Sequence, residues 1–442
     1  HDFARRLAVI GGLSVALATT LFATVRLGRS LTLGDGFDPG TFGVLVAFGG
    51  AWAGYEWLRT KEIGDFQVSD LRPTTGAATG LGLSVSGLVL LVETALTELM
   101  GVGGDVILER APGDRLATVG VLLAVGIPAL WWFWLRDLSR RETRFRNGYA
   151  AVVSYLGLVW LASSVGIAAF LVLDWLLGFG EDTASAQFEA MPVVLAVGFV
   201  AAAAWAHHVA LLRPRRGLAA RSYSYGLAGT AVIAVVSGIV TLISLAIEAV
   251  TADTLVSTSE GGSAAIAGVL GAGIGGFLWW REWTGVDLDL PDERQSMPRR
   301  VYLTGLLVVA GLAGGISLVM VLFGILQAAL EGTLGLDAIF DGRFVIALVL
   351  ATTPLIWHLI AEIRVDREAE PRVERLREAL VIASDRGPLG NGVHFVTRAD
   401  GHGAITVDIA EQIDTLLAQT GPPVVITVED DGLRVVEVEA VP

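Results

Sequence analysis

Ten stretches of the chain are predominantly apolar and nearly free of charge, and each is at least about 17 residues long, enough to cross a hydrocarbon core of roughly 30 Å as a helix. They cover residues 5–24, 41–58, 77–98, 116–135, 149–177, 190–211, 223–249, 263–281, 302–331 and 344–363. With 53% hydrophobic and 17% charged residues, the chain lies outside the range of soluble domains. The sequence therefore predicts an all-α polytopic membrane bundle of about ten transmembrane helices.

The basic residues between these stretches predict an orientation. The N-terminus and the connections after even-numbered stretches hold 18 Lys and Arg residues, whereas the connections after odd-numbered stretches hold five. Because cytoplasmic loops carry the excess of Lys and Arg, we expect both termini on the cytoplasmic side of a prokaryotic inner membrane. The chain opens with His1 and not Met, so we expect further residues upstream.

Tryptophan and arginine crowd together at the end of each even-numbered stretch, as in WWFWLRDLSRR (131–141). Indole rings prefer the headgroup level of a bilayer, and arginine just beyond them meets anionic lipid. We therefore interpret five tryptophans as membrane-interface anchors: Trp52, Trp131, Trp205, Trp279 and Trp357. An aromatic cage for a cationic ligand is the alternative.

The five anchors recur at intervals of 79, 74, 74 and 78 residues, which indicates an internal repeat. Each repeat would be a two-helix hairpin that returns to the cytoplasm, so the five copies would share one orientation. The expected units are residues 1–74, 75–146, 147–221, 222–300 and 301–364, together forming a transmembrane domain over residues 1–364.

The ends of the second helices carry a resemblance. The segments PALWWFWLR (128–136), AAAWAHHVALLR (202–213) and TPLIWHLIAEIR (353–364) share Trp followed by Arg, two of them after Pro. Together with the repeated pairs, they resemble a bacterial family of polytopic membrane proteins built from two-helix units, whose domain has no known function. The resemblance covers about residues 1–364 and implies a fold and a location, with no catalytic residues to carry over.

Acidic residues lie toward the outer ends of successive odd-numbered stretches. Glu98, Asp174 and Glu248 fall at corresponding positions, and Glu93 lies about one turn deeper. They could form an outer acidic layer that binds a cation or a basic partner, or they could be solvated carboxylates at the headgroup level. The middle third of every stretch contains no ionisable residue, which argues against ion-coupled transport.

Three histidines lie beside the repeated tryptophans: His207, His208 and His358. Imidazoles on facing helices can hold haem iron, but His207 and His208 point about 100° apart on a helix, so we expect no haem or metal there. We expect bound lipids and no other cofactor. The spacings Gly271–Gly275 and Gly311–Gly315 predict close approach between helices.

The composition changes after Arg364. Residues 365–442 hold seven Arg and 15 Asp plus Glu, and they predict a small acidic cytoplasmic α+β domain. We expect a charged helix over 365–384, a hairpin of 393–398 with 404–409, an amphipathic helix over 408–421, and a second hairpin turning at Asp431–Gly432. Its acidity argues against nucleic acid as a partner.

These features favour a non-enzymatic integral membrane protein that serves as a scaffold or accessory subunit of a membrane assembly. Its partners would be membrane lipids and either another membrane protein or further copies of itself. The alternative is a channel or carrier for a neutral or lipid-like solute. No nucleophile–base arrangement is visible in the sequence, so we do not expect an enzyme.

Overall fold

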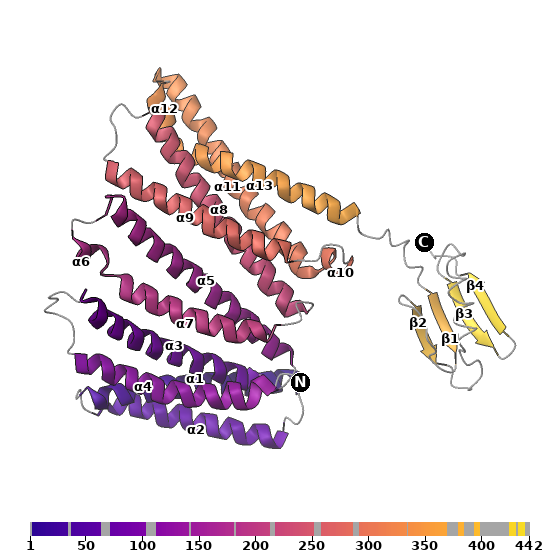
Figure 1. The fold of residues 1–442 in the computed structure, drawn as a ribbon. Coiled ribbons are helices and arrows are strands. Elements are labelled where there is room, and N and C mark those ends of the chain that lie inside the picture. The colour runs from indigo at the N-terminus through magenta and orange to yellow at the C-terminus, as the bar shows by residue number, and fades with distance from the viewer. Residues whose placement is uncertain are drawn as a thin grey trace. The chain divides into compact units, whose positions relative to one another are not determined.

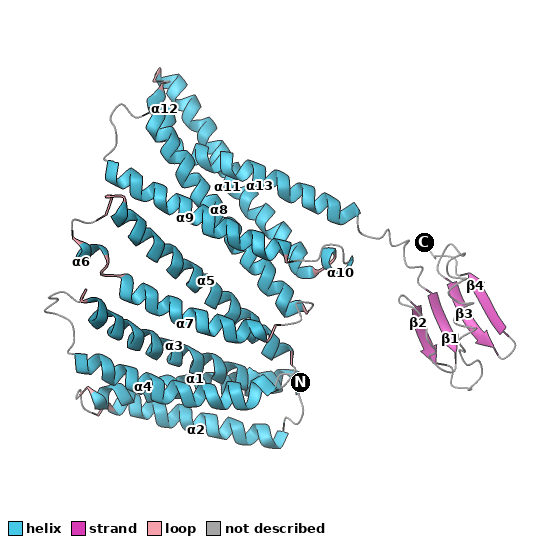
Figure 2. Ribbon diagram, in the orientation of Figure 1, coloured by secondary structure: helices cyan, strands magenta, loops and turns pink. Residues whose placement is uncertain are grey.

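The computed structural model describes residues 2–33, 37–62, 71–102, 112–140, 143–180, 183–212, 217–251, 258–285, 291–333, 335–368, 379–383, 393–397, 424–429 and 432–437. The chain divides into two compact units, residues 1–364 and 365–442. Helices build the first unit and strands are found in the second (Figure 2).

Ten long helices occupy the ten apolar stretches. They are α1 (Asp2–Thr32), α2 (Pro39–Glu62), α3 (Leu71–Met100), α4 (Pro112–Leu130), α5 (Arg144–Leu176), α7 (Met191–Ala210), α8 (Leu218–Thr251), α9 (Thr258–Thr284), α11 (Met297–Glu331) and α13 (Arg343–Glu368). The short helices are α6 (Ala184–Gln187), α10 (Pro291–Arg294) and α12 (Leu336–Asp341). A π-helix, η2 (Trp131–Asp137), and a 3₁₀ turn, η3 (Leu138–Arg140), extend α4.

Nine of the long helices in the described residues are long and apolar enough to cross a membrane, one fewer than expected from the sequence. The exception is α2, which is 24 residues long.

Consecutive helices pack as antiparallel pairs: α1 with α2, α3 with α4, α5 with α7, and α8 with α9. Figure 1 shows that the chain returns to the same end of the bundle after each pair. Neighbouring pairs also contact one another in chain order, through α1 and α3, α3 and α7, α5 and α8, and α8 and α11. The first unit is therefore a row of hairpins.

The fifth pair is more open than the other four. The backbones of α11 and α13 do not run closely side by side, and α13 instead packs its side chains over both α8 and α11. Leu359 joins Tyr225 of α8 and Tyr302 of α11 in one apolar cluster, and Ala347 packs against Val240 of α8. The expected hairpin over 301–364 is thus a looser unit whose second helix shares its contacts with the preceding pair.

Glycines set the closest helix contacts. A Cβ atom at Gly80 would lie 2.5 Å from the backbone nitrogen of Leu130, and one at Gly275 would lie 2.7 Å from the carbonyl oxygen of Ala231. The expected approach at Gly275 is therefore confirmed. The spacing Gly311–Gly315 was a wrong prediction: both positions face open space, and Gly314 makes the contact, 2.7 Å from the hydroxyl of Thr352. Spacing alone does not say which face of α11 meets a neighbour.

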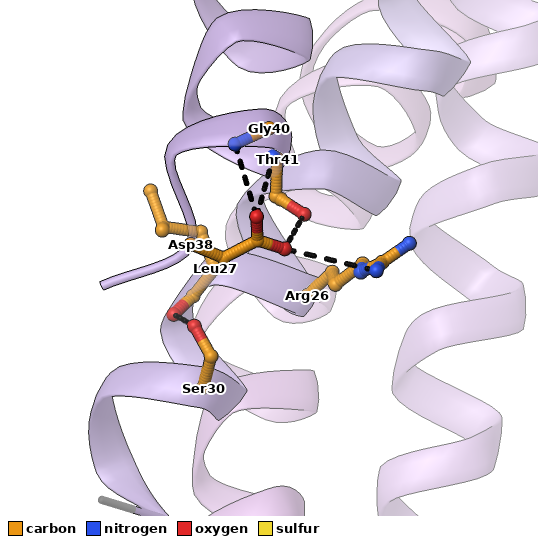
Figure 3. Close-up of polar contacts among 6 residues, drawn as sticks. All are labelled: Arg26, Leu27, Ser30, Asp38, Gly40 and Thr41. Atoms are coloured by element: carbon orange, nitrogen blue, oxygen red, sulfur yellow. Dashed lines mark hydrogen bonds and ion pairs between the residues drawn. The ribbon is translucent and has the colours of Figure 1, made fainter. Parts of the chain in front are cut away.

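A capping network fixes the start of α2 (Figure 3). The Asp38 carboxylate accepts hydrogen bonds from the backbone nitrogens of Gly40 and Thr41, at 3.0 and 3.1 Å, and from the Thr41 hydroxyl at 2.5 Å. Arg26, near the end of α1, lies 3.7 Å away as a weak, exposed ion pair. The Thr41 hydroxyl is the main reason that the pKa of Asp38 lies below its ordinary value. The cap satisfies amides that the first turn of a helix leaves free.

The second unit contains a four-stranded sheet in the order β2–β1–β3–β4. The strands are β1 (Ala379–Ala383), β2 (Val393–Thr397), β3 (Val424–Glu429) and β4 (Gly432–Glu437). β1 runs parallel to both β2 and β3, and β3 and β4 form an antiparallel hairpin with Glu429 opposite Gly432. The hairpin of these two strands is the predicted one, but Gly432, which was expected in its turn, begins β4.

The expected charged helix over 365–384 is wrong in its second half, because residues 379–383 form β1 at the centre of the sheet. Its sequence, ALVIA, is a continuous apolar run. Such runs are typical of strands buried on both faces, and periodicity cannot separate them from a helix. β2 matches the predicted strand over 393–398, and its described partner is β1. The predicted strand 404–409 and helix 408–421 lie outside the described residues.

Candidate functional site

Most aromatic, histidine and ion-pair contacts of the first unit lie at the level where the second helix of each pair ends. We call this level the tryptophan end. Trp131 and Trp357 are exposed there, at 51% and 77% of their surface. Trp52, Trp205 and Trp279 are half-buried and pack against apolar clusters between helices. The five expected anchors therefore differ in surroundings: two face outward, and three also contribute to packing.

The aromatic residues of the π-helix η2 lie partly on the surface and partly in the interior. Trp132 is exposed beside Trp131, with the guanidinium of Arg136 4.1 Å from its ring centre, whereas Phe133 and Trp134 are buried. Pro128, three residues before η2, has no N–H to donate, so the regular helical ladder is interrupted nearby. π-Helical turns are rare and often occur at functional sites.

A first aromatic cluster gathers around Trp134. Its indole N–H donates to Nε2 of His207 at 3.1 Å, and its ring lies 4.7 Å from that of Tyr149 and 4.9 Å from that of His208, measured between centroids. His208 is 3% exposed; its Nδ1 lies 2.8 Å from the carbonyl oxygen of Ala204. The cluster joins η2, the start of α5 and the end of α7.

A second cluster repeats this composition further along the chain. The ring of Trp283 lies 6.0 Å from that of Tyr302 and 6.2 Å from that of His358. Trp279 stacks on Trp283 at 5.9 Å. The three helices joined here are α9, α11 and α13, which follow in the same order as η2, α5 and α7 of the first cluster. A Trp, a Tyr and a His thus meet twice in one chain.

Buried ion pairs accompany the second cluster. Arg299 has no exposed side-chain surface, its Nη2 lies 2.7 Å from Oε2 of Glu362, and its guanidinium is 5.1 Å from the ring of Trp283. Glu293 of α10 accepts from Tyr225 at 3.0 Å and lies 2.7 Å from Nε of Arg221. These contacts tie α8, α10, α11 and α13 together at the tryptophan end.

An ion-pair network of the same kind lies near the start of the bundle. Arg72 of α3 contacts Glu56 of α2 at 2.7 Å and Asp137 of η2 at 3.2 Å. Removing charges from water is costly unless they are paired, so such networks hold helices in register. Ion pairs therefore connect successive helix pairs both near the start of the chain, at α2 and α3, and near the end of the first unit, at α8 to α13.

The predicted outer acidic residues lie at the opposite end of the helices, and three of the four have partners within the chain. Asp174 is buried, 2.5 Å from the Ser263 hydroxyl and 3.3 Å from the Gln187 amide nitrogen. Glu248 pairs with Arg343 at 3.3 Å, and Glu93 with Arg115 at 3.9 Å. Glu98 is exposed near the end of α3. Asp174, Glu248 and Glu93 therefore lie at separate helix contacts.

The three histidines are divided between the two clusters: His207 and His208 belong to the first, and His358 belongs to the second. Nε2 of His207 already accepts the Trp134 N–H. Within the described ranges, no group of three or more His, Asp or Glu side chains could hold a metal ion.

Among the described residues, apolar grooves lie deeper between the helices, and two of them are large. One, of about 440 Å³, is an open groove lined by α5, α8 and α9; Thr230 and Ser163 supply its polar side chains, and Phe170, Ile167 and Ile274 are among its apolar ones. The other, of about 600 Å³, is lined by α3, α5 and α7, with Phe199 and Leu195 in its wall. Neither is lined by an ionisable side chain.

The family described as Domain of unknown function (DUF5671) matches the chain twice, over residues 75–204 and again over residues 221–356. Together these matches cover more than half of the 442 residues. The chain belongs to the DUF5671 family. No curated protein and no solved structure matches it significantly.

Each DUF5671 match spans four long helices, which is two of the expected hairpins. The starts of the two matches differ by 146 residues and their ends by 152. Corresponding residues of the two aromatic clusters are separated by a similar distance along the chain. Trp134 precedes Trp283 by 149 residues, Tyr149 precedes Tyr302 by 153, and His207 precedes His358 by 151. The expected internal repeat is confirmed, with a family unit of four helices, and the first pair, α1 and α2, precedes both matches.

Tyrosines in the DUF5671 repeats are site residues that the sequence reasoning missed. The indole N–H of Trp205 donates to the hydroxyl of Tyr223 at 3.1 Å, and that of Trp279 donates to Tyr302 at 3.3 Å. Each bond joins the second helix of one pair to the first helix of the next. Tyr149, Tyr223 and Tyr302 are 74 and 79 residues apart, so the tryptophan period applied to tyrosine would have found them.

Proposed function

We propose that this DUF5671 protein is a non-enzymatic integral membrane scaffold, an accessory subunit of an assembly in a prokaryotic cytoplasmic membrane. The observation that carries the proposal is the row of hairpins, in which each pair contacts the next in chain order. A row has two terminal faces, at α1–α2 and at α11–α13. Such an architecture suits lateral assembly.

The cross-links between pairs support a rigid role. Trp205–Tyr223 and Trp279–Tyr302 fasten successive pairs at the tryptophan end, and Asp174–Ser263 fastens α5 to α9 at the opposite end. Alternating access would require one group of helices to rock against another around a central site. Bonds between successive pairs at both membrane levels oppose such motion, which favours a scaffold.

The orientation in the proposal follows from the loop charges: the tryptophan end is cytoplasmic, with both termini on that side. The C-terminal unit is then a cytoplasmic α+β module, and its 15 acidic residues suit a basic protein partner. A domain of this size has a small core, so docking would stabilise it. Its partner would be another membrane protein or a further copy of the chain.

Two experiments test the scaffold. Reporter fusions at residue 186 and after Pro442 should report opposite sides of the membrane, periplasmic and cytoplasmic respectively; a same-side result would refute the orientation. Native mass spectrometry of gently extracted full-length protein should find a stoichiometric partner or oligomer. Deleting residues 370–442 should keep the helices inserted and remove that partner. A monomer with no partner in both forms would refute the scaffold.

The second candidate function is a channel or carrier for a neutral or lipid-like solute. The two apolar grooves favour it, because a hydrocarbon chain could lie in either. Purified protein in vesicles with a fluorescent phospholipid in one leaflet would separate the candidates. A scaffold leaves the rate of lipid exchange between leaflets at that of protein-free vesicles, and a lipid carrier accelerates it.

A further inference from the structure

The groove between α5, α8 and α9 lies at the junction of the two family repeats. Its α5 wall belongs to the repeat over 75–204, and its α8 and α9 walls belong to the repeat over 221–356. Its volume, about 440 Å³, is within the roughly 300–1,000 Å³ of small-molecule sites in proteins. Thr230, one of its polar side chains, is hydrogen-bonded to the Tyr155 hydroxyl at 2.6 Å, so the groove presents mainly hydrocarbon.

The length of the groove is about half the thickness of the hydrocarbon core of a bilayer. On α9 it runs from Ala267 to Leu278, which is about 16 Å at 1.5 Å per residue. Half of a hydrocarbon core of about 30 Å is roughly 15 Å. The span expected on α9, residues 263–281, is centred near residue 272, so the groove extends across the middle of the membrane. An acyl chain that enters beside Leu278 would pass that middle to reach Ala267.

Arg281 lies at the shallow end of this groove. Val159, Leu227 and Leu278 line the groove and also belong to the apolar cluster that contains Trp205. The guanidinium of Arg281, one turn beyond Leu278 on α9, lies 5.5 Å from the centre of the Trp205 ring. The positive charge is therefore held next to the end of the groove, at the level of the aromatic residues.

Arg281 can still bind an anion although Glu282 lies beside it. Glu282 is 1% exposed, and one of its carboxylate oxygens lies 3.6 Å from Nε of Arg281. This contact between Glu282 and Arg281 is long, and on the arginine side it involves the Nε atom. Arg281 keeps 30% of its side chain exposed, and a guanidinium can bind a phosphate through its terminal nitrogens.

We infer that an anionic phospholipid binds here, with one acyl chain in the groove between α5, α8 and α9 and its phosphate on Arg281. The site goes beyond the scaffold role and does not require lipid transport. The lipid would fill the space between the two family repeats and stabilise their contact. Indole beside arginine at the headgroup level is the surrounding expected for such a lipid.

The test uses full-length protein reconstituted in vesicles of equal parts phosphatidylglycerol and phosphatidylcholine, re-extracted in mild detergent. Native mass spectrometry counts the retained lipids. We expect one phosphatidylglycerol per chain in excess over phosphatidylcholine. Arg281→Gln should reduce that preference about fivefold, the effect of one basic residue at a membrane surface, and Arg281→Lys should largely keep it.

Ala267→Phe tests the groove itself. Ala267 is exposed and lines the groove, so the larger ring should fill the space without disturbing buried packing and should remove the retained lipid. Matched controls are Ala203→Phe, on an exposed face of α7 outside both grooves, and Arg136→Gln, at the exposed Trp132. Circular dichroism and size-exclusion profiles verify folding of each variant.

Three results would overturn the inference. The wild type could retain no lipid in excess, Arg281→Gln could keep the wild-type preference, or Ala267→Phe could retain as much lipid as Ala203→Phe. Loss of the lipid without loss of a protein partner leaves the scaffold intact. The two proposals therefore fail separately.

Discussion

The close contact between α8 and α9 predicts that one added methyl group, at Gly238, would destabilise the protein. A Cβ atom at Gly238 of α8 would lie 2.5 Å from both the backbone nitrogen of Ala272 and the carbonyl oxygen of Gly268 on α9. Ordinary contact begins at 3.4 Å, so Gly238→Ala requires the two helices to separate by 3.4 minus 2.5, or about 0.9 Å. Backbone atoms cannot rotate away as a side chain can.

The magnitude follows from that separation. A gap of about 0.5–1 Å forfeits a quarter to a half of the dispersion energy of each atom pair it opens. Overpacking of this kind costs about 1–3 kcal/mol in protein interiors. Because α8 and α9 also form two walls of the proposed lipid groove, the same variant should weaken lipid retention.

Two further glycines of α9 complete the series. A Cβ atom at Gly268 would lie 3.0 Å from the flexible side chain of Leu242 and 3.2 Å from a backbone oxygen, so Gly268→Ala should cost less than Gly238→Ala. Gly273 is exposed with nothing within 4 Å, and alanine there should be neutral or stabilising by up to about 1 kcal/mol through helix propensity.

Thermal unfolding in detergent, followed by tryptophan fluorescence and circular dichroism, gives the order of the series. We expect the Tm of Gly238→Ala to fall by several degrees, that of Gly268→Ala to fall less, and that of Gly273→Ala to stay level or rise. Equal effects at Gly238 and Gly273 would show that helix propensity and not backbone contact governs these positions, and the described packing would be refuted.

Three other predictions concern the polar contacts. A double-mutant cycle with Trp205→Phe and Tyr223→Phe should give a coupling of about 1 kcal/mol in unfolding free energy, and zero coupling would contradict the hydrogen bond. Arg299→Met should destabilise by about 3 kcal/mol, the low end for a broken buried pair because Glu362 is 24% exposed, whereas Arg136→Met should change the free energy of unfolding little. Because the pKa of Asp38 is lowered in the folded state, its contribution to the start of α2 is present above its ordinary value of 3.8 and is lost as pH falls through the lower, folded value. The protection factors of the Gly40 and Thr41 amides, which are the exchange rates of an unstructured chain at the same pH divided by the observed rates, should therefore fall in acid in the wild type, and Asp38→Asn should abolish that fall.

Local sequence patterns were enough to predict the long helices, the repeat and one hairpin of this protein. The length of each apolar run determines a long helix, because hydrogen bonds within the helix satisfy the backbone without water. The tryptophan period indicated the repeat, and the family matches confirm it at twice that period. Two-residue turn chemistry identified the hairpin of β3 and β4.

The tertiary structure decided what depends on faces and partners. Periodicity does not tell which glycine of α11 meets α13, and the contact is at Gly314. It does not distinguish ALVIA in a central strand from the same letters in a helix. The meeting of Trp134, Tyr149 and His207 needs three helices brought together from 73 residues of chain. Sequence specifies each helix through contacts along the chain, whereas the clusters and the groove arise from contacts between helices, which only packing determines.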